Sequence, residues 1–193
     1  MTIILDPGHG MGNRRPGVYD PGAVGVGKTT EAEVVMEWAN EVRAFLQCLG
    51  HRVIRTRAGA SDPAHVSERA EIARDYRGIV MLSLHCNSFN GTASGTETFF
   101  RGAQHRALAE RVNAAVTKTL GTKDRGVKAE GASQHPRLAV MAFQPTVLLE
   151  IGFIDNPGDH GKMTDPSMRA QACEALANVL DSFVREQTKT KTK

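Results

Sequence analysis

Short apolar runs alternate with helical segments along this chain, and this order limits the fold more than any other feature of the sequence. Val34, Val35 and Trp38 begin a stripe of apolar residues spaced by three and four, which predicts an amphipathic helix over residues 31–49. Residues 3–5, 79–84 and 146–151 are apolar runs typical of buried strands. The other predicted elements are strands over 51–56 and 95–100 and helices over 66–76, 103–120 and 166–185, while the polar, Gly-rich residues 121–137 are expected to form a loop over one edge of the sheet. Alternating strands and helices predict an α/β fold.

Size and composition fit one domain without a membrane-spanning segment. The chain has 193 residues, of which 40% are hydrophobic, enough for one sizeable core. We expect a folded domain over residues 1–187 and a disordered Lys/Thr tail over 188–193. No apolar run is long enough to cross a bilayer, and the first apolar stretch is too short for a secretory signal.

Charge and cysteine content exclude two further classes of protein. The net charge of +3 is modest, and few aromatic residues accompany the basic ones, so we expect no nucleic-acid partner. Cys48, Cys86 and Cys173 are odd in number and widely spaced, which argues against a disulfide framework. Cys48 and Cys173 fall in helical patterns, where we expect them in the core.

His9, His85 and Glu150 each stand where a predicted strand ends. Open α/β sheets bind ligands beyond the carboxyl ends of their strands, so the three side chains are expected to share one crevice. The Gly- and Pro-rich loop over residues 10–30 should border it. Any one of these residues alone would more often be an ordinary loop or core residue.

Glu150 is the most informative of the three because it lies within one of the most apolar segments of the chain. Burial of an unpaired polar group costs several kcal/mol, about 2 to 7 even for a neutral one. A structural role would therefore need an Arg or Lys partner. Water activated by a metal ion is the alternative partner.

A metal site would need a third ligand besides His9 and His85, since catalytic zinc usually keeps three protein ligands and one position for water. Cys86 cannot share a metal with His85, because successive strand side chains point to opposite faces. Glu31 continues the buried stripe of its helix, whereas Glu33 lies on the solvated face. Glu31 is therefore the better ligand.

The remaining histidines, which stand in polar contexts, are expected to face solvent. They are His51, His65, His105, His135 and His160.

A competing motif lies between Gly22 and Thr29, where the sequence matches the phosphate-binding pattern G-x-x-x-x-G-K-[ST]. That motif needs an apolar strand just before its first glycine, and residues 13–21 contain none. It also needs a later strand that ends in a magnesium-binding Asp, whereas residues 79–84 lead to His85. The motif matches without the strands that should accompany it, so a nucleotide hydrolase is kept only as the second interpretation.

Four ordered motifs give the chain a family resemblance. They are DPGHG at 6–10, GAVG at 22–25 followed by Glu31, SLHCN at 83–87 and LLEIGFIDN at 148–156, with GTE at 95–97 and RGVK at 125–128 also matching. Together they resemble the zinc-dependent N-acetylmuramoyl-L-alanine amidases of type 3, nearly from end to end. Two departures are Met11, where the family usually has glycine, and a longer loop around residues 13–19.

The resemblance implies a mixed, six-stranded sheet flanked by helices, a zinc ion held by His9, Glu31 and His85, and Glu150 as the catalytic base. The implied reaction cleaves the amide between N-acetylmuramic acid and L-alanine in peptidoglycan. Without a visible signal peptide or wall-binding module, the chain is more similar to phage endolysins than to secreted amidases. We then expect a monomer made in the cytoplasm that acts on the wall after release. A catalytically inactive wall-binding module is a third interpretation.

Overall fold

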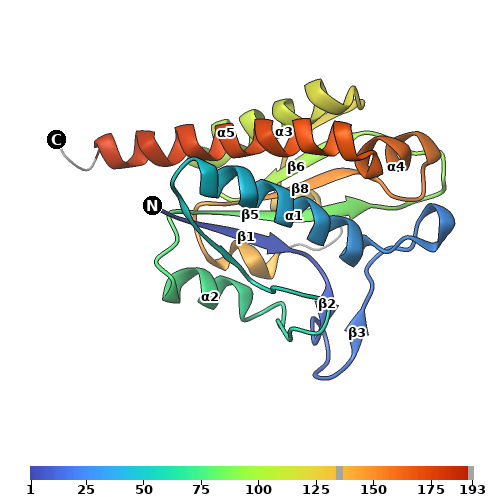
Figure 1. The fold of residues 1–193 in the computed structure, drawn as a ribbon, viewed down its shortest axis with the longest axis horizontal. Helices are drawn as coiled ribbons and strands as arrows, with labels where there is room; N and C mark the ends of the chain where they lie inside the picture. The colour runs from blue at the N-terminus through green and yellow to red at the C-terminus, as the bar shows by residue number, and fades with distance from the viewer. Residues whose placement is uncertain (134–136, 191–193) are drawn as a thin grey trace.

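The fold is a mixed six-stranded sheet between two unequal layers of helices (Figure 1). The computed structural model describes residues 1–133 and 137–190. The strand order is β4-β1-β5-β8-β6-β7, in which β6 is antiparallel to β8 and every other neighbouring pair is parallel. The strands are β1 (Thr2–Pro7), β4 (Arg52–Arg55), β5 (Val80–Asn87), β6 (Thr96–Phe100), β7 (Asp124–Ala129) and β8 (Thr146–Phe153).

One face of the sheet carries the larger helical layer. Helices α1 (Glu31–Cys48) and α3 (Arg106–Leu120) lie against the strands, and α5 (Pro166–Thr190) packs along both of them (Figure 1). α4 (Pro157–Thr164) joins β8 to α5. Trp38 is fully buried in this core, where its indole nitrogen donates a hydrogen bond to the carbonyl oxygen of Met163. Leu149 and Ile151 of β8 point into the same core.

The opposite face is covered only in part, and this leaves room for a site. α2 (Arg69–Asp75) and the short helix η4 (Ala139–Ala142) pack over Ile4 and Met81, and Met141 of η4 covers Phe99 and Leu148. Three further 3-10 turns are η1 (Val26–Lys28), η2 (Ala103–His105) and η3 (Glu130–Ala132). No helix of the described residues is long and apolar enough to span a bilayer.

Strand register aligns three polar residues on this partly covered face. Within the sheet, His85 of β5 pairs with Glu150 of β8, and Glu150 pairs with Glu97 of β6. Directly paired residues have their side chains on the same face, with Cβ atoms about 4.5 to 5.5 Å apart. His85, Glu150 and Glu97 therefore form a row across three strands.

The predicted α/β fold with a mixed sheet is confirmed, but several element boundaries were wrong. β5 continues three residues and β8 two residues beyond the predicted ends, so His85 and Glu150 lie inside strands and not at their ends. Residues 121–137, predicted as a loop, contain the edge strand β7. β7 escaped prediction because an edge strand with polar residues on both faces shows no apolar alternation.

The predicted irregular loop over residues 10–30 contains a small hairpin. β2 (Gly10–Met11) pairs antiparallel with β3 (Tyr19–Asp20), so the residues around 13–19 form the turn between them. At the other end of the chain, α5 continues to Thr190, five residues past its predicted end. The predicted tail over 188–193 therefore begins as helix, and residues 191–193 lie outside the described part of the chain.

Two predictions about single side chains were also wrong. Cys48 is exposed, because it ends α1 on the side away from the core, whereas Cys173 is buried as expected. His51 was expected in solvent but is 6% exposed, and its Nε2 lies 2.7 Å from Oδ1 of Asp181 on α5. A hydrogen bond between residues 130 positions apart cannot be predicted from the local sequence.

Candidate metal and catalytic site

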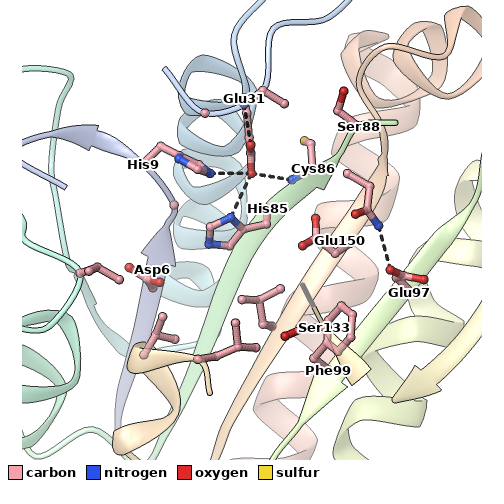
Figure 2. A pocket seen from close by; sticks show the side chains of 18 of the residues that line it. Asp6, His9, Glu31, His85, Cys86, Ser88, Glu97, Phe99, Ser133 and Glu150 are labelled. Atoms are coloured by element: carbon pink, nitrogen blue, oxygen red, sulfur yellow. Dashed lines mark hydrogen bonds and ion pairs between the residues drawn. The ribbon is translucent and has the colours of Figure 1, made fainter. Parts of the chain in front are cut away.

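Three predicted ligands converge at one point beside the carboxyl ends of β1 and β5 (Figure 2). Oε1 of Glu31 lies 3.0 Å from Nε2 of His9 and 2.9 Å from Nδ1 of His85. The ligand atoms of the three residues all lie within 4.8 Å of one another. Two imidazoles and one carboxylate are a donor set that suits zinc, and catalytic zinc sites use the same combination. The residues present therefore fit the ion that the resemblance implies.

Two glycines make room for these ligands. A Cβ atom at Gly8 would lie 2.3 Å from Cε1 of His85, and one at Gly22 would lie 2.6 Å from Oε2 of Glu31. Gly22 also has φ +68°, a left-handed conformation that favours glycine. These contacts explain in physical terms why the DPGHG and GAVG motifs carry glycine at those positions.

The turn that presents His9 is held by two buried arginines. His9 itself has φ 61°, which costs of order 1 to 3 kcal/mol in a residue other than glycine. Arg69 donates to the carbonyl oxygens of Pro7 and His9, and Arg57 donates to those of Pro7 and Gly8. Five guanidinium donors in a fixed fork suit this task, because one side chain can satisfy several buried carbonyl groups.

The amino terminus of α1 and the loop before it orient Glu31, and their backbone amides are mostly engaged in hydrogen bonds. Thr30 caps the helix in a capping box with Glu33, whose Oε2 accepts a hydrogen bond of 3.0 Å from the Thr30 amide. Oε2 of Glu31 accepts one of 3.0 Å from the Ala23 amide. In the segment from Gly22 to Thr29, the first two amides donate to carboxylates, and the amides of Gly25, Val26, Lys28 and Thr29 donate to backbone carbonyl groups. The strand before Gly22 is β3 of the small hairpin and not a strand of the main sheet.

Asp20 supports the site from behind His9, and the sequence analysis missed it. Its Oδ2 lies 3.1 Å from Nδ1 of His9 and accepts a hydrogen bond of 2.6 Å from Asn13, while Oδ1 accepts one from the Gly22 amide. Burial alone would raise the pKa of Asp20, but Asn13, the Gly22 amide and His9 lower it. A carboxylate on the far nitrogen of a metal-binding histidine fixes its tautomer and orientation.

The charged groups of the predicted ligand set shift one another's pKa values. Burial would raise the pKa of Glu31, but the imidazoles of His85 and His9 hold it well below its usual range. Burial would lower the pKa of His9, but Glu31 and Asp20 raise it. The carboxylate is therefore ionised and faces two basic nitrogens, as a cation site requires.

Glu150 lies beside the ligand set without joining it. It projects from β8 between His85 and Glu97, and its buried Oε2 has no hydrogen-bond partner among the described residues (Figure 2). Burial and the negative charges of Glu31 and Glu97 raise the pKa of Glu150 well above its usual value. The arrangement leaves one carboxyl oxygen available for a proton next to the three predicted ligands.

Cys86 lies on the other side of the strand, as strand alternation predicted. Its sulfur lies in the helical core, 3.8 Å from that of Met163, while its backbone amide donates to Glu31. Of the other histidines, His65, His105 and His160 are partly exposed, and His135 lies outside the described residues.

The site opens into a groove of about 990 Å³. Its walls include the ligand residues, Glu150, Phe89 on the rim, and the basic residues Arg14, Arg125, Lys128 and Arg137.

Comparison with known proteins decides the family. The sequence profile of the N-acetylmuramoyl-L-alanine amidase family matches residues 3–182. The chain belongs to this amidase family. The resemblance inferred from four short motifs is thereby confirmed, and the motif residues described above are those of an amidase-family domain.

Relatives of this amidase-family chain include several wall enzymes. It is 35% identical over 200 residues to a protein described as an uncharacterized cell wall amidase of Bacillus anthracis, covering 94% of this chain and 35% of that protein. It is 30% identical over 189 residues to the N-acetylmuramoyl-L-alanine amidase LytC of Bacillus subtilis, covering 95% and 36%. The chain thus spans about a third of the length of these two relatives.

Solved amidase structures share the fold. The catalytic domain of CwlV from Paenibacillus polymyxa superimposes with a TM-score of 0.82 at 23% identity, covering 95% of this chain and 98% of that one. The amidase AmiC2 of Nostoc punctiforme also gives 0.82, at 24% identity, covering 96% and 97%. At this level of identity the likeness establishes the fold.

Proposed function

We propose that the chain hydrolyses the amide bond between N-acetylmuramic acid and L-alanine in peptidoglycan, with a zinc ion held by His9, Glu31 and His85. The observation that carries the proposal is the convergence of two imidazoles and one carboxylate within 4.8 Å, inside a groove and beside a glutamate whose Oε2 is buried and unpaired among the described residues. Family membership and the amidase activity for which LytC is named support this choice of substrate.

The bound zinc ion would act as a Lewis acid that polarises the amide carbonyl and stabilises the negative charge that develops on its oxygen. Glu150 takes a proton from the attacking water molecule and returns it to the amine that leaves. Glu150 suits this task because one of its carboxyl oxygens has no hydrogen-bond partner among the described residues and can hold the proton between the two steps. Asp20 holds His9 in the tautomer that presents Nε2 to the metal.

Two other functions have weaker support. The nucleotide hydrolase needs free backbone amides between Gly22 and Thr29, and most of these are bonded to other groups. An inactive wall-binding module would not need an unpaired buried carboxyl group beside the ligand set, because such a group costs stability. We propose further that the chain acts as a monomer on the wall, outside the membrane, where peptidoglycan lies.

Mass spectrometry of digested peptidoglycan tests the reaction. We expect released stem peptides with a free amino group on L-alanine and glycan strands that keep the lactyl carboxylate. Cleavage between sugars, cleavage within the peptide, or binding without any cleavage would contradict the proposal.

A further inference from the structure

A pair of basic residues lies on the groove wall next to Glu150, and the reaction proposed above gives it no role. Nζ of Lys128 lies 2.5 Å from Oε2 of Glu97, and Nε of Arg125 lies 2.9 Å from the same oxygen. The amide of Asn87 donates to the other oxygen of Glu97, at 2.9 Å. Glu97 is 5% exposed and is the direct strand neighbour of Glu150.

A bulge in β7 places both cations on one face of the sheet. Residues three apart in a regular strand point to opposite faces, so Arg125 and Lys128 could not both reach Glu97. Between the pairs Thr96 to Asp124 and Thr98 to Val127, β7 contains one residue more than β6. Gly126 lies in this bulge with φ +80°, which glycine adopts without strain. The extra residue shifts the alternation of side chains between the two faces of the sheet by one position. Arg125 and Lys128 therefore lie on the same face, toward the groove.

The cluster holds more positive charge and more donors than Glu97 can use. Two cations face one carboxylate, which leaves a net positive charge on this part of the wall. Among the described residues, Nη2 of Arg125 has no hydrogen-bond partner, and Nζ of Lys128 donates a hydrogen bond only to Glu97. The side chains of Arg125 and Lys128 are 30% and 33% exposed, and both line the groove. Glu97 positions the cations, and their free donors face the substrate space.

We propose that Arg125 and Lys128 form a subsite for a carboxylate of the stem peptide, on the leaving-group side of the amide that is cut. This inference rests on the proposed function. The sugars of the glycan strand are uncharged, so the negative charge of the substrate near the cut bond lies on its peptide. The cluster is one strand spacing from Glu150, about 4.8 Å, and one peptide residue spans about 3.8 Å. The matching group is the α-carboxylate of the residue that follows L-alanine.

Paired substrates that differ only at this carboxylate test the subsite. Muramoyl tripeptides can be made with a γ-linked D-glutamate as second residue, whose α-carboxyl group is either free or converted to the carboxamide. Charge-assisted hydrogen bonds to two cations should give the free carboxylate an advantage of about 10- to 100-fold in kcat/KM. Arg125→Gln and Lys128→Gln should each bring this ratio toward one, mainly through KM. Lys123→Gln, an exposed residue outside the groove, is the matched control and should keep the ratio.

The dissociation constants of both tripeptides for Glu150→Gln protein, measured by titration calorimetry, separate binding from turnover. Tighter binding of the tripeptide with the free carboxylate, weakened by Lys128→Gln, would support the subsite. This holds even if the unaltered enzyme cuts neither tripeptide, because failure to cut would refute only the proposed function. Equal affinity for the two tripeptides would overturn the subsite. So would Lys128→Gln and Arg125→Gln variants that lose activity equally on both substrates, because the cations would then serve only to hold Glu97.

Discussion

Oε1 of Glu31 is the atom that the other groups of the candidate site contact. Two imidazole nitrogens and the Cys86 amide lie within 3.0 Å of this one oxygen. Glu33, only two residues away, has its carboxylate in the capping box on the exposed side of the same helix turn. Helical periodicity alone separated the two glutamates, because a spacing of two residues turns a side chain to the far side of a helix.

This separation gives a paired prediction. Glu31→Ala should lose bound zinc and hydrolysis together, since it removes a ligand. Glu33→Ala should keep both and lose about 0.5 to 2 kcal/mol of unfolding free energy at most, because it weakens a helix cap. Zinc content by atomic absorption and a turbidity assay on purified walls measure the two effects. Equal losses in the two variants would refute the assignment of Glu31 as ligand.

Asp20 gives a second prediction about a residue that touches no metal. Asp20→Ala frees the His9 ring, so zinc affinity should fall by about 10- to 100-fold while the fold is kept. Competition with a chelator of known affinity measures the change. Arg14→Ala is the control, because Arg14 contacts the same carboxylate at 3.5 Å from a side chain that is 70% exposed. Such surface pairs contribute little. Asp20→Ala protein with unaltered zinc affinity would rule out this role.

Sequence reasoning found the residues that carry a local pattern and missed those that act over a distance. His9, Glu31, His85 and Glu150 follow from strand ends, helical periodicity and an acid in an apolar run. Asp20, Arg57 and Arg69 could not be found in this way, because their contacts depend on where the chain folds back. The glycines at 8 and 22 could be recognised as motif positions, but the ligand side chains that need their space are visible only in three dimensions.

At the scale of elements, β1 and the turn after it depend on one buried ion pair. Asp6 is fully buried, and its carboxylate accepts hydrogen bonds from Arg69, Ser83 and Thr56 at 2.7, 2.6 and 2.6 Å. Burial alone would raise the pKa of Asp6, but Arg69 and the two hydroxyl groups lower it to about 2. The pair connects β1 to β4, α2 and β5.

Acid should therefore weaken the fold through Asp6. Its folded pKa of about 2 lies below the unfolded value of 3.8, so its stabilising effect is complete above about pH 5 and is lost as pH falls toward 2. The difference in unfolding free energy between the unaltered protein and Asp6→Asn should shrink by about 2 kcal/mol between pH 5 and pH 2. Urea denaturation across this range measures it. A difference that stays constant with pH would show that Asp6 is not ionised by this ion pair.

Elements differ in how much of them the sequence could predict. α1, β5 and β8 were predicted because each buries a long apolar face. β7 and α4 were not, since an edge strand and a short Gly-containing helix bury little and show weak periodicity. The bulge at Gly126 was also beyond prediction, because only the pairing with β6 reveals the extra residue.

At the scale of the whole molecule, a ligand of the native state must stabilise the entire cooperative unit. Zinc at a hundred times its dissociation constant should raise the unfolding free energy of metal-free protein by about 2.7 kcal/mol. For a chain of this size, this corresponds to a rise in melting temperature of about 5 to 10 °C. Magnesium with a nucleoside triphosphate should give no shift, and Lys28→Ala should not alter the response to zinc. A shift with nucleotide that Lys28→Ala abolishes would instead favour the nucleotide hydrolase.

The central claim is that Glu150 is the catalytic base, whereas His9, Glu31 and His85 are the zinc ligands. Zinc content measured together with the rate of wall hydrolysis tests this assignment most directly. Glu150→Gln keeps the size of the side chain but cannot carry a proton between water and amine. We predict that it folds, keeps the zinc of the unaltered protein and hydrolyses walls at least about a hundredfold more slowly. His9→Ala and His85→Ala should lose zinc as well as activity. Glu150→Gln protein that has lost its zinc, or that has kept both zinc and full activity, would contradict the claim.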